Sequence, residues 1–175
     1  SRTHLYLQYP ITNSSSSYTI SDEDDGDFIN VAELDSQFDI LFSNSRTTTG
    51  SNSITACTLG ASSADCLEIT DNSIVQGRPT AMKASQFAVA TPTLFVGTQN
   101  SRLIRIANAN SNNAKVVTNI GSCQFLGSVS DIEFGASELE IYVTFHNYGI
   151  NNVWFTNDGG ATWSQKDGNL PDIPV

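Results

Sequence analysis

The chain has 175 residues, of which 39% are hydrophobic and 15% charged, so it can bury an ordinary core and is neither disordered nor a coiled coil. A formal net charge of −10 repels phosphate backbones, which argues against nucleic-acid binding and favours a basic ligand or a divalent cation. No apolar run approaches the roughly 18 residues that a membrane-spanning helix needs, so no transmembrane segment is expected.

Two short apolar segments, HLYLQYP and SYTIS, come first in the chain, and an acidic turn follows them at residues 21–28. The acidic turn carries carboxylates of the kind that Ca²⁺ prefers, on Asp22, Asp24, Asp25 and Asp27. Their spacing fails the register of an EF-hand loop. A Ca²⁺ site and a solvated acidic loop therefore both stay open as interpretations of this turn.

The rest of the chain consists of short apolar segments that are rich in β-branched and aromatic residues and are bounded by Gly, Pro, Asn and Ser, which predicts strands. The predicted strands are residues 28–35, 38–44, 93–99, 102–109, 114–120, 129–135, 139–147, 152–157 and 162–167. Helical apolar periodicity does not extend beyond about two turns. The sequence therefore predicts an all-β fold.

Three cysteines are present, and two of them, Cys57 and Cys66, bracket the turn-like stretch TLGASSAD. In an oxidising compartment they would close a small hairpin and contribute about 2–3 kcal/mol, although two unrelated thiols would have the same spacing. Cys123 is then unpaired, and we expect it to be buried. No Cys or His spacing indicates a zinc site.

Three stretches, residues 31–44, 79–100 and 129–147, follow one pattern: a strand of small or mixed residues, a turn, and an aliphatic-aromatic strand. The repeat of about 50 residues has room for four short strands, which is typical of a β-propeller blade, although a β-sandwich is the alternative. The expected fold is a partial β-propeller of about three four-stranded antiparallel blades. Its units are the outer strands of a preceding blade (1–21) and blades at 22–77, 78–127 and 128–175.

The last predicted hairpin contains the stretch TNDGGATW, in which Asp-Gly-Gly allows the positive φ of a tight turn. The carboxylate in the turn can accept backbone N–H groups, the two threonine hydroxyls can brace it, and the indole can anchor it by burial. The pattern resembles the Asp box of BNR and sortilin-like β-propeller repeats of secreted or cell-surface bacterial proteins. The matching residues are Thr156, Asp158, Gly160, Thr162 and Trp163.

The resemblance covers roughly residues 26–175, and it implies that the Asp box is a structural element on the blade periphery, away from ligands. It also implies an extracellular or cell-surface binding or scaffold module for a protein or a glycan, non-catalytic in this segment. Since three blades cannot close a ring, we expect a fragment of a seven- or eight-blade propeller. The remaining blades, from the same or another chain, would pack against residues 28–44 and 139–163.

The alternative function is part of a propeller glycoside hydrolase. Asp131 and Glu133 lie two residues apart on a predicted inner strand, and Glu33 and Asp35 repeat this arrangement. Carboxylates facing a channel could act as acid and base in glycoside hydrolysis, or they could be a polar lining. None of the five arginines lies on these strands, which argues against a sialidase site.

Overall fold

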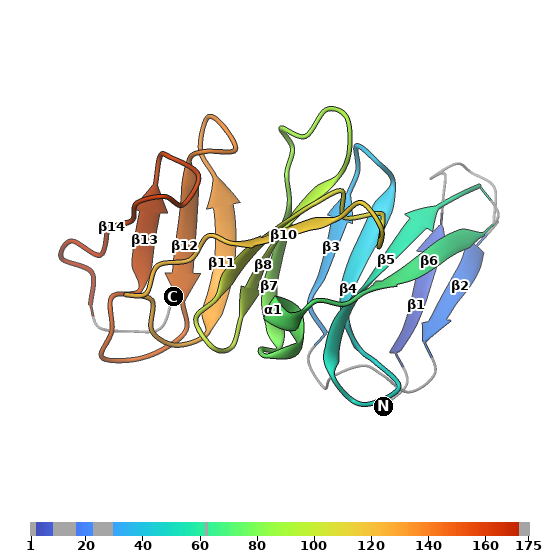
Figure 1. Cartoon of the computed structure of the whole chain (residues 1–175), viewed down its shortest axis with the longest axis horizontal. Helices are drawn as coiled ribbons and strands as arrows, with labels where there is room; N and C mark the ends of the chain where they lie inside the picture. Colours follow the sequence, from blue (N-terminus) through green and yellow to red (C-terminus); the bar gives the residue numbers. More distant parts are fainter. Residues whose placement is uncertain (1–2, 9–16, 23–29, 62, 172–175) are drawn as a thin grey trace.

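The computed structural model describes residues 3–8, 17–22, 30–61 and 63–171, and it describes side chains from residue 30 onward. Within these residues the protein is all-β, with three four-stranded antiparallel sheets (Figure 1). Two further strands, β1 (Thr3–Gln8) and β2 (Ser17–Asp22), pair with each other antiparallel. The predicted all-β class and its four-stranded sheets are therefore confirmed.

In each four-stranded sheet the strands lie next to one another in chain order. The first sheet contains β3 (Ala32–Asp35), β4 (Ile40–Arg46), β5 (Asn52–Leu59) and β6 (Ala64–Ile69). The second contains β7 (Pro79–Ala84), β8 (Thr93–Thr98), β9 (Leu103–Ala107) and β10 (Val116–Asn119). The third contains β11 (Val129–Phe134), β12 (Ile141–Phe145), β13 (Val153–Thr156) and β14 (Ser164–Gln165).

The three sheets are stacked in series, with the first strand of each sheet toward the middle of the molecule (Figure 1). Strand β7 contacts β3 on one side and β11 on the other. One buried cluster joins the first and second sheets through residues such as Phe42 and Val96, and another joins the second and third sheets through Phe95 and Val143. Apolar burial between neighbouring sheets is therefore the main stabilising force of the fold.

A single helical turn, α1 (Asn72–Val75), connects β6 of the first sheet to β7 of the second. Asp71 precedes the turn, and its side chain accepts a hydrogen bond of 2.8 Å from the backbone N–H of Ser73, as an N-cap residue does. Ile74 is fully buried in the cluster between the two sheets. The connection is thus anchored at both its polar start and its apolar face.

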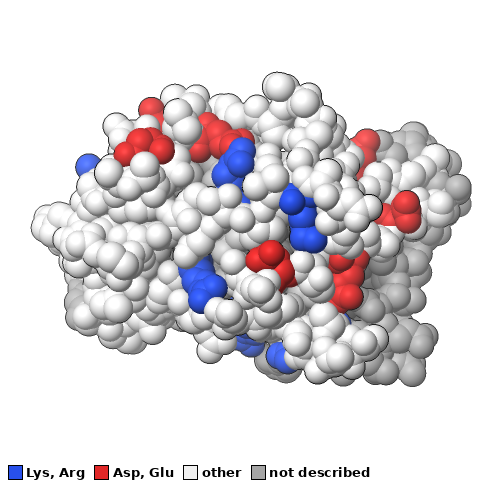
Figure 2. All heavy atoms as spheres, viewed as in Figure 1, with Lys and Arg blue, Asp and Glu red and all other residues white. Residues whose placement is uncertain are grey.

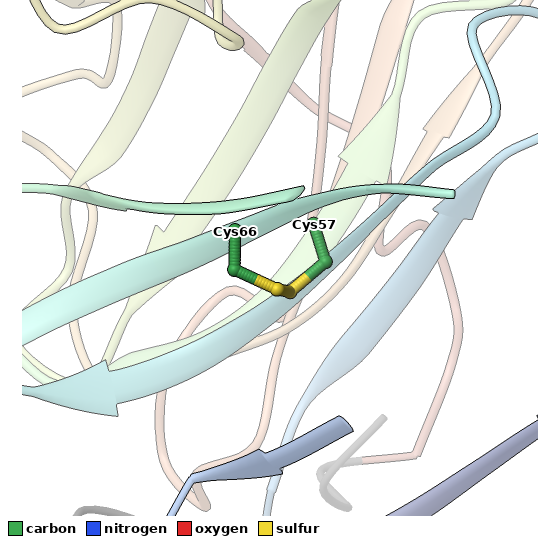
Figure 3. Close-up of a disulfide and its surroundings, with 2 residues drawn as sticks. All are labelled: Cys57 and Cys66. Atoms are coloured by element: carbon green, nitrogen blue, oxygen red, sulfur yellow. A yellow bond between two sulfur atoms is a disulfide. The ribbon is translucent and has the colours of Figure 1, made fainter. Parts of the chain in front are cut away.

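The disulfide predicted between Cys57 and Cys66 is present (Figure 3). The two cysteines lie directly opposite each other on β5 and β6, so the bond clamps the outer hairpin of the first sheet. The prediction for Cys123 is wrong, because this thiol is exposed. In the turn that contains Cys123, the side chain that reaches the core between the second and third sheets is that of Phe125.

Figure 2 shows the face of the molecule seen in Figure 1, where basic and acidic side chains lie in small separate groups. Most of this face belongs to residues of other types, which agrees with the low charged fraction of 15%. On this face the excess of acid is thus spread out, without one broad field of a single sign.

Candidate functional site

The first strands of the three sheets place three charged residues at the same position. In each sheet this residue pairs across the strands with an aromatic residue of the second strand. The pairs are Glu33–Phe42, Lys83–Phe95 and Glu133–Tyr142. The charged residues are 50 positions apart along the chain, and we call Glu33, Lys83 and Glu133 the inner-strand ladder.

Hydrogen bonds connect the strands that carry the ladder from one sheet to the next. The Lys83 Nζ atom donates to Glu133 Oε2 across 2.8 Å, which links the second sheet to the third. On the other side, the backbone N–H of Ala84 donates to Glu33 Oε1 across 3.0 Å, which links the second sheet to the first. The ladder therefore runs across all three sheets as one polar row.

The pKa values of the two carboxyl groups in the ladder are shifted in opposite directions. Burial raises the pKa of Glu33, and the N–H of Ala84 and the charge of Lys83 offset only part of this. The hydrogen bond from Lys83 lowers the pKa of Glu133, and the same contact raises the pKa of Lys83. Glu133 is thus held in its ionised form, whereas Glu33 has the greater affinity for a proton.

A hollow of about 240 Å³ opens beside the ladder, between the end of β7 and the turn that joins β3 to β4. Its lining includes Glu33, Lys83 and Asp35, of which Asp35 is only 4% exposed. Asp35 Oδ1 accepts hydrogen bonds from the backbone N–H groups of Gln37 (3.0 Å) and Phe38 (3.2 Å), so it shapes the turn. Its Oδ2 atom is buried without a hydrogen-bond partner. Asp35 is therefore part of the wall of the hollow, and the partly exposed Glu33 is the carboxylate that the hollow offers to a ligand with hydroxyl or amine donors.

Asp131, the third carboxylate of the hydrolase alternative, is exposed on β11. Its Oδ1 atom accepts a 2.9 Å hydrogen bond from the backbone N–H of Ile132. The strand has an irregular register between Val129 and Asp131, which interrupts the simple alternation of side chains. The structure therefore brings Glu33 and Glu133 to either side of Lys83 and leaves Asp131 outside these contacts.

The turn at residues 156–163 is closed by its own side chains. Asp158 Oδ1 accepts hydrogen bonds from the Thr156 hydroxyl (2.6 Å) and from the Thr162 N–H (2.9 Å), and Asp158 Oδ2 accepts one from the Thr162 hydroxyl (2.6 Å). These bonds, led by the one from Thr156, lower the pKa of Asp158 to about 2. The N–H of Gly160 donates to the Thr156 hydroxyl oxygen across 3.0 Å.

This turn also contacts the second sheet. Gly160 has a φ of 95°, and a Cβ atom there would lie 2.6 Å from the carbonyl oxygen of Ile120. The Trp163 indole contacts Ile120 as well and packs against Phe125. The geometry of the turn is therefore that of a structural link between two sheets.

No family model, curated protein or solved structure matches the chain. Among the described residues, no helix is long and apolar enough to cross a membrane.

The residues predicted as Ca²⁺ ligands are not part of the site that the structure describes. Asp24, Asp25 and Asp27 lie outside the described residues, and Asp22 ends β2 without a described side chain. In the part of the chain that is described, no three His, Cys, Asp or Glu residues are grouped to hold a metal ion. The Ca²⁺ site thus stays a prediction.

Sequence reasoning missed one charged network that joins the second and third sheets. Arg105 on β9 donates from Nε (3.0 Å) and from Nη2 (2.7 Å) to Glu138 Oε1. The other oxygen of Glu138 accepts a 2.5 Å hydrogen bond from the hydroxyl of Ser85. The three residues are far apart in the sequence and match no short motif, so no local signal could have identified them.

Proposed function

We propose that the three sheets are consecutive blades of a β-propeller module that binds or scaffolds a protein or a glycan, without catalysis in this segment. The observation that carries the proposal is the inner-strand ladder. Residues at the same position of three successive sheets lie side by side and 50 residues apart, as inner strands of a propeller do around its axis. A β-sandwich contains two sheets, so it does not account for a charged residue at the same position of three successive sheets.

The turn at residues 156–163 supports the assignment to the BNR and sortilin-like repeats. Asp158 is surrounded by the threonine donors that the Asp box pattern places around it. The contacts of Gly160 and Trp163 with Ile120 of the preceding blade give the motif a structural role, and the ladder belongs to other strands.

An extracellular or cell-surface location is part of the proposal. The disulfide between Cys57 and Cys66 is the supporting observation, since such bonds persist in oxidising compartments. The surface also depends on uncharged polar residues, as only 15% of the chain is charged.

The ligand would meet the ladder and the adjoining hollow, where Glu33 provides an acceptor and Lys83 a donor. Hydroxyl groups of a glycan and basic side chains of a protein both suit this lining, and the net charge of −10 favours a basic partner.

The test is a binding screen of the folded chain against an immobilised glycan array and an array of cell-surface proteins, followed by titration of each hit. We expect Lys83→Ala and Glu33→Gln to weaken a genuine hit at least tenfold. Glu68→Gln, an exposed change on β6, is the control and should leave it unchanged. A ligand whose affinity is the same for the parent and both ladder variants would place binding elsewhere and contradict the proposal.

A glycoside hydrolase is the second candidate, and one observation favours it: the pKa of Glu33 is raised while that of Glu133 is lowered. Glycosidases separate the roles of two carboxyl groups in this way. The ion pair of Glu133 with Lys83 opposes it, because the carboxylate is already engaged. Fluorogenic glycosides test the two functions. Turnover that Glu33→Gln abolishes would establish the hydrolase, and no turnover above buffer is expected for the binding module.

A further inference from the structure

The aromatic residues that pair with the ladder differ in exposure in a regular way. Phe42 on β4 is fully buried and Phe95 on β8 is 1% exposed, whereas Tyr142 on β12 is 42% exposed. The first two are covered because the following sheet packs over them. Tyr142 has the same position in the third sheet, but among the residues that the structure describes no following sheet covers it.

The two covering sheets use the same chemistry. Over Phe42, the second sheet places Leu94 and Val96 of its second strand, and both are fully buried. In the interface that contains Phe95, the third sheet places Ile141 and Val143 of its second strand, and both are again fully buried. In both interfaces between neighbouring sheets, an aromatic residue of one sheet therefore packs in the same cluster as an aliphatic pair of the next sheet.

The uncovered face of the third sheet is built like the covered ones. The rings of Tyr142 and Phe155 are in contact, with centroids 4.6 Å apart and planes tilted by 37°, and Lys166 Nζ lies 5.5 Å from the centroid of Phe155. Glu133 borders these rings, with 57% of its side chain exposed. We call Tyr142, Phe155, Lys166 and Glu133 the third-sheet open face. At the other end of the stack, the opposite face of the first sheet is closed, since Leu41, Cys57 and Leu59 are buried.

We propose that the third-sheet open face docks a fourth blade of the same repeat. This blade would place an aliphatic pair of its second strand over Tyr142 and Phe155. Its inner strand would offer Glu133 a hydrogen-bond donor, because each ladder position already bonds to the next inner strand: Ala84 N–H donates to Glu33 and Lys83 donates to Glu133. The inference rests on the proposed function in one respect, the assignment of the sheets to propeller blades, and it is argued from the continuity with two existing interfaces.

The first experiment uses the chain as it is and asks whether the open face is free. We expect the double variant Tyr142→Lys/Phe155→Lys to remain folded with a small drop in Tm and to bind several-fold less of an apolar dye. Phe95→Lys is the matched control, and burying its charge under the third sheet should unfold the protein. Unfolding of the double variant to the same extent would show that the face is already covered, and would overturn the proposal. So would a dimer of the parent chain in light scattering that the double variant loses, because the occupant would then be a second copy.

The second experiment supplies the occupant. The full chain is extended after Val175 by a duplicate of its own residues 128–171. The duplicate carries the aliphatic pair that covers Phe95 and is marked by Tyr142→Phe. We expect hydroxyl-radical oxidation of the original Tyr142 to fall several-fold and the Tm to rise. Replacing the aliphatic pair of the duplicate by Ile141→Asp/Val143→Asp should restore the oxidation.

Unchanged oxidation of the original Tyr142 overturns the proposal, whether the duplicate folds apart from the chain or stays unfolded, because in either case the face has not docked it. The outcome is independent of the ligand screen. If no glycan or protein binds at the ladder, the binding proposal fails, but docking of the duplicate can still protect Tyr142 from oxidation. If Tyr142 is not protected, the docking proposal fails, but a ligand can still bind at the ladder.

Discussion

The Nε1 atom of Trp163 donates a hydrogen bond to the carbonyl oxygen of Ile120 across 2.9 Å, which ties the last hairpin of the third sheet to the end of the second. The indole also packs edge-on against Phe125, with ring centroids 4.9 Å apart. The tryptophan of the turn thus acts between two sheets rather than within one.

Substitutions of Trp163 should separate these two contributions. Trp163→Phe removes the hydrogen bond and keeps a ring against Phe125, so we expect a loss of about 1 kcal/mol in the free energy of unfolding. Trp163→Ala removes both and should cost about 2–3 kcal/mol. Urea unfolding followed by circular dichroism measures the difference. Equal losses for the two variants would show that the ring contact with Phe125 contributes nothing.

The close approach of Gly97 to Val129 predicts a large effect for a small change. A Cβ atom at Gly97 on β8 would lie 2.3 Å from Val129 Cγ1 on β11, so Gly97→Ala forces the second and third sheets apart. We expect a loss of about 1–3 kcal/mol. In the double variant with Val129→Ala the clash is relieved, and the total loss should be smaller than the sum of the single losses. Strict additivity in denaturant unfolding would contradict this contact.

Glu33 and Glu133 have equivalent positions, yet their neutral variants should act in opposite directions. The pKa of Glu33 is raised above 4.5, so its ionised form opposes folding above that pKa. Glu33→Gln keeps an oxygen acceptor for Ala84 N–H and should raise the Tm at pH 7, with the gain lost below about pH 4. The pKa of Glu133 is lowered by Lys83, so Glu133→Gln should reduce the Tm at pH 7.

Thermal unfolding between pH 3 and pH 8 measures both effects, and the loss caused by Glu133→Gln should likewise disappear in acid as the parent carboxylate is protonated. The shift for Glu133→Gln should be modest, because the side chains of Lys83 and Glu133 are 31% and 57% exposed. Shifts of the same sign for the two variants would contradict the assignment of burial to Glu33 and of the ion pair to Glu133.

The lowered pKa of Asp158 predicts an acid-sensitive turn. With a folded pKa of about 2 and an ordinary value of 3.8, its contribution to stability is present above about pH 4 and is lost as the pH falls toward 2. Asp158→Asn should therefore lower the Tm at pH 7 and make little difference at pH 2. A Tm difference that is constant from pH 7 to pH 2 would show that the carboxylate charge plays no part.

Thiol chemistry separates the three cysteines. Without reductant, a maleimide reagent should label one thiol per folded chain, that of the exposed Cys123, and three after reduction and unfolding. Cys57→Ser/Cys66→Ser should lower the free energy of unfolding by about 2–3 kcal/mol, the loop-entropy value for a bridge across nine residues of sequence separation. Labelling of more than one thiol in the native, oxidised chain would contradict the bridge.

The sequence was most informative where the physical cause is local. The Asp-Gly-Gly turn after β13 requires positive φ and carries its own acceptors, so both the turn and the bonds of Asp158 could be predicted from eight residues. The disulfide followed in the same way from two cysteines around one short turn.

What the sequence could not provide depends on how the sheets stack. The sequence identifies Glu33 as an inner-strand carboxylate, but its raised pKa comes from its burial in the folded protein, where Ala84 of the second sheet contacts it. The sequence predicts a buried Cys123 because thiols are usually buried, but in the structure Cys123 is exposed and Phe125, two residues later, is buried instead. Such choices are decided by packing between segments that are distant in the sequence, which no local pattern reports.

The hydrogen bonds between the inner strands β3, β7 and β11 have an almost equal spacing along the chain, and this has a consequence for folding. The bonds from Thr80 to Val129, from Lys83 to Glu133 and from Ala84 to Glu33 all join residues 49 to 51 positions apart. The entropy lost in closing each interface is then almost the same, since loop closure depends on chain length only logarithmically. Assembly should therefore behave like a one-dimensional array of nearest neighbours, in which each sheet can associate with the next as soon as both exist.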